Sequence, residues 1–148
     1  MEKANEGPVF YRGVYIDAPA EKVWEALTTP EVINQYYLRP IHTLELKKGG
    51  KILYGEDGKN IRISGEILEI EEMKKLAHSF SFTSLSDPPT RVTYEIGEMG
   101  EMALLKWTHD QFPEENKSYQ NISYGWDVIL SNLKTLLETG KVLPWPKE

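Results

Sequence analysis

Few side chains in this sequence are suited to proton-transfer chemistry. The chain contains three histidines, and two of them, His78 and His109, fall in stretches whose alternation of polar and apolar residues is typical of β-strands. His78 shares a strand face with aromatic residues, so it is either a polar anchor in an apolar cleft or a histidine satisfied by a neighbouring hydroxyl. His109 precedes Asp110, which can orient an imidazole as a base, although strand-end histidines are commonly structural. No nucleophile accompanies either histidine, so the sequence assigns no catalytic residue.

Other kinds of site chemistry lack the residues that they need. The chain has no cysteine, and its histidines show no metal-ligand spacing, so we expect neither a metal site nor a cofactor. No phosphate-binding glycine loop or nucleophile elbow is present. Glutamates follow one predicted strand, where alternation gives no evidence that two of them converge across a cleft as a catalytic pair, and they indicate an acidic, solvated sheet edge. They are Glu66, Glu69, Glu71 and Glu72.

Aromatic residues are the strongest indication of a binding site. They crowd the faces that the alternation turns inward, and each can bury about 150–250 Å². They either fill the core or line a pocket for a flat or hydrophobic small molecule, because ligand pockets are mostly apolar with a few polar anchors. The cavity candidates, including two apolar helix residues, are Tyr36, Tyr37, Tyr54, His78, Phe80, Phe82, Trp107, Ile122, Trp126 and Ile129.

A helix near the C-terminus would cover these inward faces. From Ser118 to Gly140 apolar residues recur at three- and four-residue steps, which predicts one long amphipathic helix. Gly140 and the prolines that follow it would end this helix. Gly125 in a helix interior costs about 1 kcal/mol relative to alanine, which suggests a close approach to a strand or a ligand.

The rest of the chain reads as strands and two short helices. The helices begin near Glu21 and Pro30, after a first strand at residues 9–17. Gly65 marks an expected bulge in the longest strand, and Gly97 to Gly100 an expected turn. This order predicts an α+β fold, with a curved antiparallel sheet of about seven strands wrapped on the C-terminal helix. The later strands are expected at residues 41–46, 51–54, 60–71, 76–83, 91–96 and 101–109.

Length and composition indicate one globular domain. We assign residues 9–143 to it, with a flexible N-terminus at 1–8 and a tail at 144–148. The net charge of −6, without a basic cluster, argues against nucleic-acid binding. No apolar run is long enough for a membrane span and no leader pattern is present, so we expect a soluble, cytoplasmic protein.

Several segments in this order resemble a known superfamily. The chain is similar to the START-like, polyketide-cyclase-like (SRPBCC) proteins, and most to the branch related to the C-terminal domain of the activator of Hsp90 ATPase. The family usually has tryptophan where this chain has Tyr36 and Tyr37, which implies a different pocket shape. The segments that carry the resemblance are Ile16 to Thr28, Gly65 to Ile67, Ser79-Phe80, Arg91 to Glu95, Thr108-His109 with Phe112, and Gly125-Trp126 through Gly140.

The resemblance implies a helix-grip fold, in which a curved sheet holds the last helix over an apolar cavity. We expect a non-catalytic protein, a monomer or weak homodimer, whose partner is a hydrophobic or aromatic small molecule. One alternative is a module that modulates a chaperone in the stress response, as the Hsp90 activator does. The other is a cyclase- or dehydratase-like enzyme that uses His78 or His109 with a carboxylate such as Glu95 or Asp110.

Overall fold

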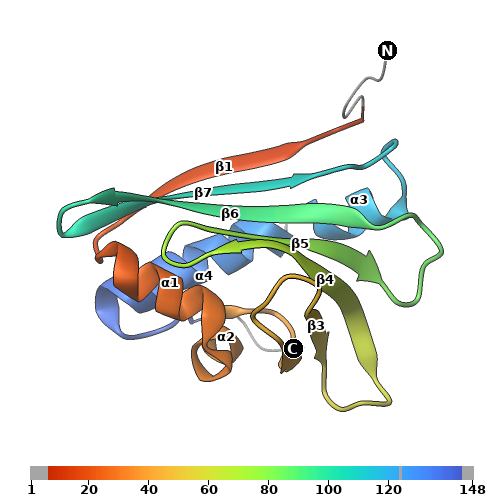
Figure 1. Ribbon diagram of the computed structural model, residues 1–148, viewed down its shortest axis with the longest axis horizontal. Helices are drawn as coiled ribbons and strands as arrows, with labels where there is room; N and C mark the ends of the chain where they lie inside the picture. Colours follow the sequence, from red (N-terminus) through yellow and green to blue (C-terminus); the bar gives the residue numbers. More distant parts are fainter. Residues whose placement is uncertain (1–6, 124, 145–148) are drawn as a thin grey trace.

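A seven-stranded antiparallel sheet and four helices form the part of the chain that the computed structural model describes, residues 7–123 and 125–144 (Figure 1). The strands are β1 (Phe10–Ile16), β2 (Ile41–Leu44), β3 (Lys51–Gly55), β4 (Ile61–Glu71), β5 (Lys75–Phe82), β6 (Thr90–Met99) and β7 (Met102–Asp110). The helices are α1 (Ala20–Thr28), α2 (Pro30–Tyr36), α3 (Lys117–Ile122) and α4 (Gly125–Thr139).

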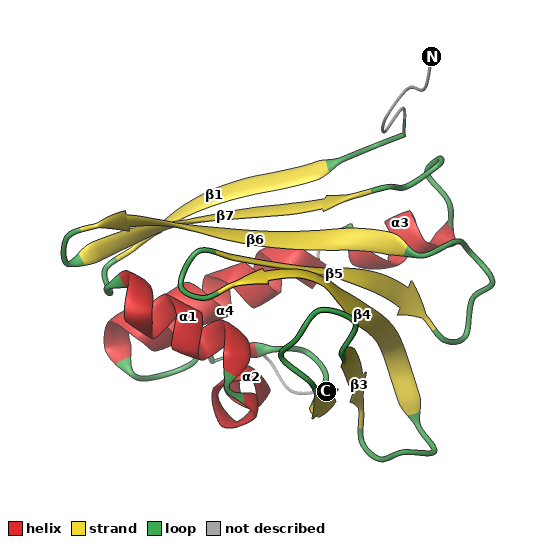
Figure 2. Ribbon diagram, viewed as in Figure 1, coloured by secondary structure: helices red, strands yellow, loops and turns green. Residues whose placement is uncertain are grey.

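The sheet follows the order β1-β7-β6-β5-β4-β3-β2, so the first strand returns to pair with the last. Turns and loops join β2 through β7 in sequence, whereas α1 and α2 carry the chain from one edge of the sheet to the other. The sheet curls around α4, with β1 on one side and β3 on the other (Figure 2). The predicted α+β helix-grip fold, including two short helices after the first strand, is confirmed.

Alternating burial in the strands and a single apolar stripe on α4 create the core. In β7 the side chains of Leu105 and Trp107 have no solvent exposure, while Lys106 between them points outward. On α4, Trp126 and Leu133 are buried in the same apolar cluster. Because burying such a side chain contributes about 1.5–3 kcal/mol, this interface between sheet and helix stabilises the fold.

The predicted helix from Ser118 to Gly140 is wrong as one element, because it is divided into α3 and α4. At the end of α3 the Ser123 hydroxyl donates to the Gln120 carbonyl oxygen at 3.1 Å, a local bond that competes with the helical ladder. Gly125 is therefore the first residue of α4 and not an interior one. The predicted end is confirmed, since Gly140 follows α4 with φ of +80° and its backbone N–H donates to the Leu136 carbonyl oxygen.

The register of β4 is irregular at Leu68, against β5, and at Arg62, against β3, and not at the predicted Gly65. The register between β4 and β5 changes between Ile67 and Glu69, which leaves Leu68 as the extra residue. Gly65 serves a different purpose, because a Cβ at this position would collide with the carbonyl oxygen of Ser79. The absence of a side chain lets β5 approach β4 closely there.

Two smaller expectations are also corrected. The last turn is tighter than predicted, since Met99 pairs with Met102 and only two residues separate β6 from β7. The acidic strand is no sheet edge, because β4 lies between β3 and β5.

Residues 1–6 and 145–148 of the predicted termini lie outside the described residues. Within the described ranges, no helix is both long and apolar enough to cross a membrane.

Candidate functional site: a pocket between the sheet and α4

An open pocket lies where the helices meet β4 and β5. Its volume is about 980 Å³, near the upper end of the range of roughly 300–1,000 Å³ that is usual for small-molecule sites. Residues from β4 and β5 form one wall, α3 and α4 form another, and the segment after α2 borders the opening. The lining residues are Tyr37, Leu38, Arg39, Ile63, Phe80, Phe82, Asn121, Ile122, Gly125, Trp126 and Ile129.

The sheet wall of the pocket follows from strand alternation. Phe80 and Phe82 are two residues apart on β5 and therefore share a face, and Ile63 on β4 pairs directly with Phe82. The two phenylalanine rings meet edge to face with centroids 5.2 Å apart. Phe80 is buried, whereas Phe82 is only partly buried. The wall is thus apolar and partly open to a ligand.

Trp126 on α4 is fixed by a chain of buried hydrogen bonds. Its indole Nε1–H donates to His109 Nδ1 at 3.0 Å, so the imidazole proton lies on Nε2, which donates to Thr90 Oγ1 at 2.7 Å. The Thr90 hydroxyl then donates to the Phe80 carbonyl oxygen at 3.1 Å. Burial, with a smaller effect from His78, lowers the pKa of His109 well below its usual range. His109 is therefore neutral, with both nitrogens engaged, and acts as a structural link between sheet and helix.

His78 lies in the core and not on the pocket wall. Its Nδ1–H donates to the backbone carbonyl oxygen of Ser79 at 2.8 Å, in place of the expected hydroxyl partner. Among the described residues its Nε2 has no hydrogen-bond partner, and neither has the indole Nε1 of Trp107. Burial lowers the pKa of His78 to about 4, so the ring is neutral near pH 7.

Three tyrosines join the end of α2 to the sheet and to α1. Tyr37 stacks on Tyr54 of β3 with ring centroids 4.4 Å apart and an angle of 13° between the planes. The Tyr36 hydroxyl donates to the Ala26 carbonyl oxygen at 2.8 Å. Desolvation raises the pKa of all three phenols above the ordinary value, so they stay protonated across the physiological range.

The structure brings six of the predicted cavity residues together at the pocket and places four elsewhere. The six that line it are Tyr37, Phe80, Phe82, Ile122, Trp126 and Ile129. The four outside the lining are buried in the core around it: Tyr36, Tyr54, His78 and Trp107. Their role in ligand binding stays a prediction.

The residues that border the opening were not predicted from the sequence. Leu38 and Arg39 follow α2 in an irregular segment, where no periodicity indicates which way a side chain points. Asn121 in α3 is exposed and also borders the pocket. Gly125 makes no tight backbone approach, because an added Cβ would lie at an ordinary 3.6 Å from Leu38 Cδ1.

The residues considered for catalysis do not assemble at the pocket. Arg91 binds both carboxylate oxygens of Asp110, at 2.9 and 2.7 Å, so the pairing of Asp110 with His109 that base catalysis would need is not formed. Glu95 is exposed on the outer face of the sheet, between the strand partners Lys75 and Lys106. In residues 7–123 and 125–144, no group of three or more histidine, aspartate or glutamate side chains could hold a metal ion.

The curved sheet, the covering helix and the pocket between them define an α+β domain of the helix-grip class. The family model described as "Activator of Hsp90 ATPase homolog 1-like protein" matches residues 17–138, and the chain belongs to this family. A comparison with curated protein sequences finds no significant match.

Solved structures of similar fold come from several organisms. CalU16 from Micromonospora echinospora is 23% identical with a TM-score of 0.72, and the match covers 96% of this chain and 88% of CalU16. PFC0360w from Plasmodium falciparum, described as an HSP90 activator, is 24% identical with a TM-score of 0.74, covering 88% and 96%. The Aha1 dimer from Colwellia psychrerythraea is 20% identical with a TM-score of 0.75, covering 90% and 98%. At these identities the likeness is evidence for the fold alone.

Proposed function

We propose that this protein binds a hydrophobic or aromatic small molecule in the pocket between the sheet and α4, without transforming it chemically. The observation that carries the proposal is the open pocket of about 980 Å³ with an apolar wall that includes Phe80, Phe82 and Trp126. The aromatic side chains of the core leave this space unfilled. The fixed position of Trp126 supports binding, because a wall that is already ordered loses little conformational entropy when a ligand enters.

The expected driving force is burial of the ligand's apolar surface. At about 25 cal/mol per Å², each 100 Å² of ligand surface removed from water contributes roughly 2.5 kcal/mol before the cost of association is subtracted. The indole N–H of Trp126 already donates to His109, so Trp126 offers a ligand only its ring surface. Shape and apolar contact are therefore expected to dominate recognition by this wall.

A thermal-shift screen with fatty acids, flavonoids, sterols and polyketide-like aromatics tests this function. A compound that binds only the folded state raises the melting temperature in a saturable way. Gly125→Leu adds a side chain that extends from α4 toward Leu38, another lining residue, and should abolish the increase in melting temperature. Gly125→Ala adds only a methyl group at ordinary contact distance from Leu38 and should retain the increase. If no compound stabilises the protein, or if Gly125→Leu responds like the unmodified chain, binding in this pocket is refuted.

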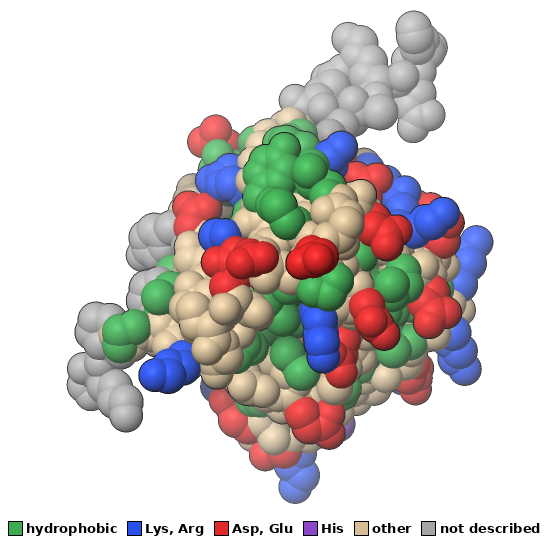
Figure 3. Space-filling model, turned by 90° about the vertical axis from the view of Figure 1, so that its left-hand side faces the viewer, with side chains coloured by type: hydrophobic (Ala, Val, Ile, Leu, Met, Phe, Trp, Pro, Cys, Tyr) green, Lys and Arg blue, Asp and Glu red, His purple; other side chains and the backbone are tan. Residues whose placement is uncertain are grey.

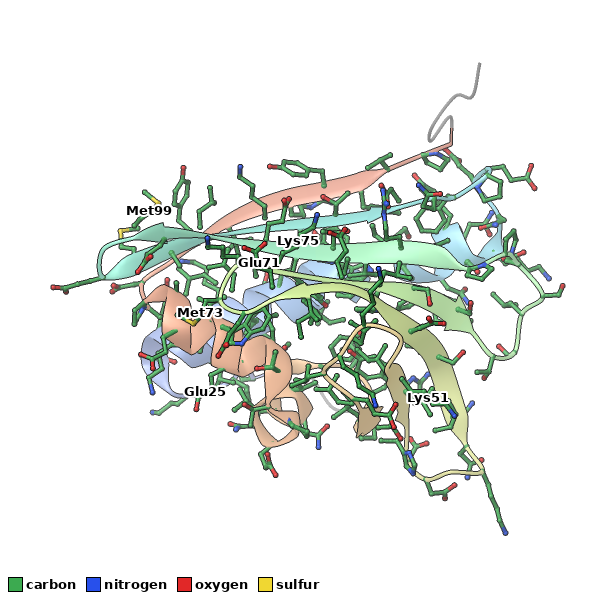
Figure 4. All side chains as sticks on the ribbon, in the orientation of Figure 1. Glu25, Lys51, Glu71, Met73, Lys75 and Met99 are labelled. Atoms are coloured by element: carbon green, nitrogen blue, oxygen red, sulfur yellow. The ribbon has the colours of Figure 1, made fainter. Side chains whose placement is uncertain are left out.

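Modulation of an Hsp90-type chaperone is the second candidate, favoured by the family match and by apolar residues on the outer face of the sheet. Tyr15 and Met102 project there, and both are exposed. Figure 3 looks onto the end of the molecule with the β6–β7 hairpin and shows a hydrophobic patch bordered by charged side chains. Met99 lies at the tip of this hairpin (Figure 4). Such a surface is suited to contact with another protein.

Addition of the purified protein to an Hsp90 ATPase assay tests the second candidate. A saturable change in ATPase rate that is weakened by Tyr15→Glu and retained by Gly125→Leu would assign the activity to the outer face. An unchanged rate across a range of concentrations would refute it. The two variants thus separate chaperone contact from ligand binding.

A further inference from the structure

The charged group of the pocket lies at its opening. Arg39 is exposed and belongs to the lining, as does the exposed amide of Asn121. The wall opposite the opening consists of apolar side chains such as Phe80 and Ile129. No aspartate or glutamate is among the described residues that line the pocket, so its local charge is positive although the chain as a whole carries −6.

Arg39 also differs in its surroundings from Arg12 and Arg91, which are held by carboxylates. Arg12 pairs with Asp127 at 3.0 Å, and Arg91 is held by Asp110. The guanidinium of Arg39 has no hydrogen bond or ion pair in the described part of the chain. A guanidinium has five N–H donors in a planar fork that matches carboxylate and phosphate oxygens. Its donors are therefore available to a ligand.

From this arrangement, and resting on the proposed function, we infer that the pocket takes an amphipathic anion. The ligand has an apolar body, which lies against Phe80 and Trp126, and one carboxylate or phosphate head group, which binds the Arg39 guanidinium at the opening. The Asn121 amide borders the same opening and supplies a further donor to the head group. Arg39 thus fixes the orientation of the ligand, with its charged end toward solvent.

The exposure of Arg39 sets the size of the effect. A charge-assisted hydrogen bond is stronger than a neutral one, but solvent and salt screen an exposed pair. We therefore expect the charged head group to improve affinity by roughly threefold to tenfold over a neutral one, with the advantage falling as ionic strength rises. Burial of the apolar body supplies the remaining affinity, which the neutral analogue shares.

Calorimetric titration with dodecanoate, dodecyl phosphate and dodecan-1-ol, each below its aggregation concentration, tests the inference. The unmodified protein should bind one or both anions more tightly than the alcohol, and the tighter anion identifies the head group. Arg39→Gln should reduce anion affinity to the level of the alcohol and leave alcohol affinity unchanged. Arg62→Gln is the matched control, since Arg62 is exposed and precedes Ile63 in β4 but does not line the pocket. This control should retain the preference for anions.

The failures of the two proposals give different results. Equal binding of alcohol and anions, or an equal loss of anion affinity in Arg39→Gln and Arg62→Gln, would overturn the inference and leave the proposed function standing. Absence of binding by all three probes and by every compound of the thermal-shift screen would overturn both. Tighter anion binding that depends on Arg39, and that weakens as salt rises from about 50 to about 500 mM and shortens the Debye length about threefold, would support the inference.

Discussion

At the scale of single residues, the bond from Trp126 to His109 determines how the pocket wall is held. It joins α4 to the β7 strand through groups that are all buried, and it continues through Thr90 to the backbone of β5. Breaking it leaves a buried acceptor without a donor, which costs about 1–3 kcal/mol. The same hydrogen bond thus stabilises the pocket wall and occupies the Nδ1 lone pair of His109.

Two tryptophans allow a matched test of this bond. Trp126→Phe and Trp107→Phe make the same chemical change in buried positions, but only Trp126 has a hydrogen-bond partner for its indole N–H among the described residues. We expect Trp126→Phe to lower the free energy of unfolding by about 1–3 kcal/mol more than Trp107→Phe does, measured by urea denaturation. Equal losses would mean that the bond contributes nothing to stability.

The buried histidines predict a loss of stability in acid. The pKa of His78 is lowered to about 4 and that of His109 is lowered well below its ordinary value, so the unfolded chain binds more protons as the pH falls below about 6.5. The free energy of unfolding keeps its full value above this pH and falls progressively toward pH 4, because protonation of the two imidazoles favours the unfolded chain. His78 alone accounts for a loss on the order of 3 kcal/mol over this window.

Urea unfolding between pH 7.5 and 4.5 measures this dependence. His78→Leu removes one of the two groups and should flatten the decline, whereas His42→Gln, at an exposed position, should leave its slope unchanged. A decline of equal slope in the unmodified protein and in His78→Leu would show that other groups, such as carboxylates, cause the acid sensitivity.

Pocket residues could be predicted from the sequence where periodicity determines the direction of the side chain. The alternation in β5 identified Phe80 and Phe82, and the helical stripe identified Trp126, all of which line the pocket. Arg39 could not be found in this way, because it lies in an irregular segment between α2 and β2. The Trp126–His109 bond joins residues from different elements, and no local pattern encodes such a contact.

At the scale of elements, the strands and their antiparallel order could be predicted because they depend on alternation and short turns. The break between α3 and α4 could not, because Ile122 and Trp126 are four residues apart and keep the apolar stripe continuous across it. The bulge in β4 was expected at Gly65, since glycine in a strand indicates either a bulge or a close backbone approach. The structure shows the close approach.

Alanine substitutions at Gly65 and Gly125 are expected to differ in their effect on stability. Gly65→Ala places a methyl group against the Ser79 carbonyl oxygen and should destabilise the protein by about 2 kcal/mol or more. Gly125→Ala makes only ordinary contact with Leu38 at the start of α4, and should change stability by less than about 0.5 kcal/mol. Thermal and urea unfolding of both variants measure the difference. Similar losses would contradict the close approach at Gly65.

At the scale of the whole molecule, the curved sheet and α4 enclose a pocket that stays open on the side of α2. The family match and the helix-grip fold fix the architecture but not the ligand, because one fold supports many functions. The ligand-binding role depends on whether the space beside Trp126 admits a hydrophobic molecule in solution.

Chemical-shift mapping by ¹H–¹⁵N NMR during a titration with dodecanoate tests this role most directly. We predict saturable shifts of the backbone amides of Phe80, Phe82 and Ile129 and of the Trp126 indole N–H, which reports on its bond to His109. These shifts should persist in Gly125→Ala and disappear in Gly125→Leu. Shifts that are confined to the outer face, around Tyr15 and Met102, or that are equal in both variants, would contradict binding in the pocket.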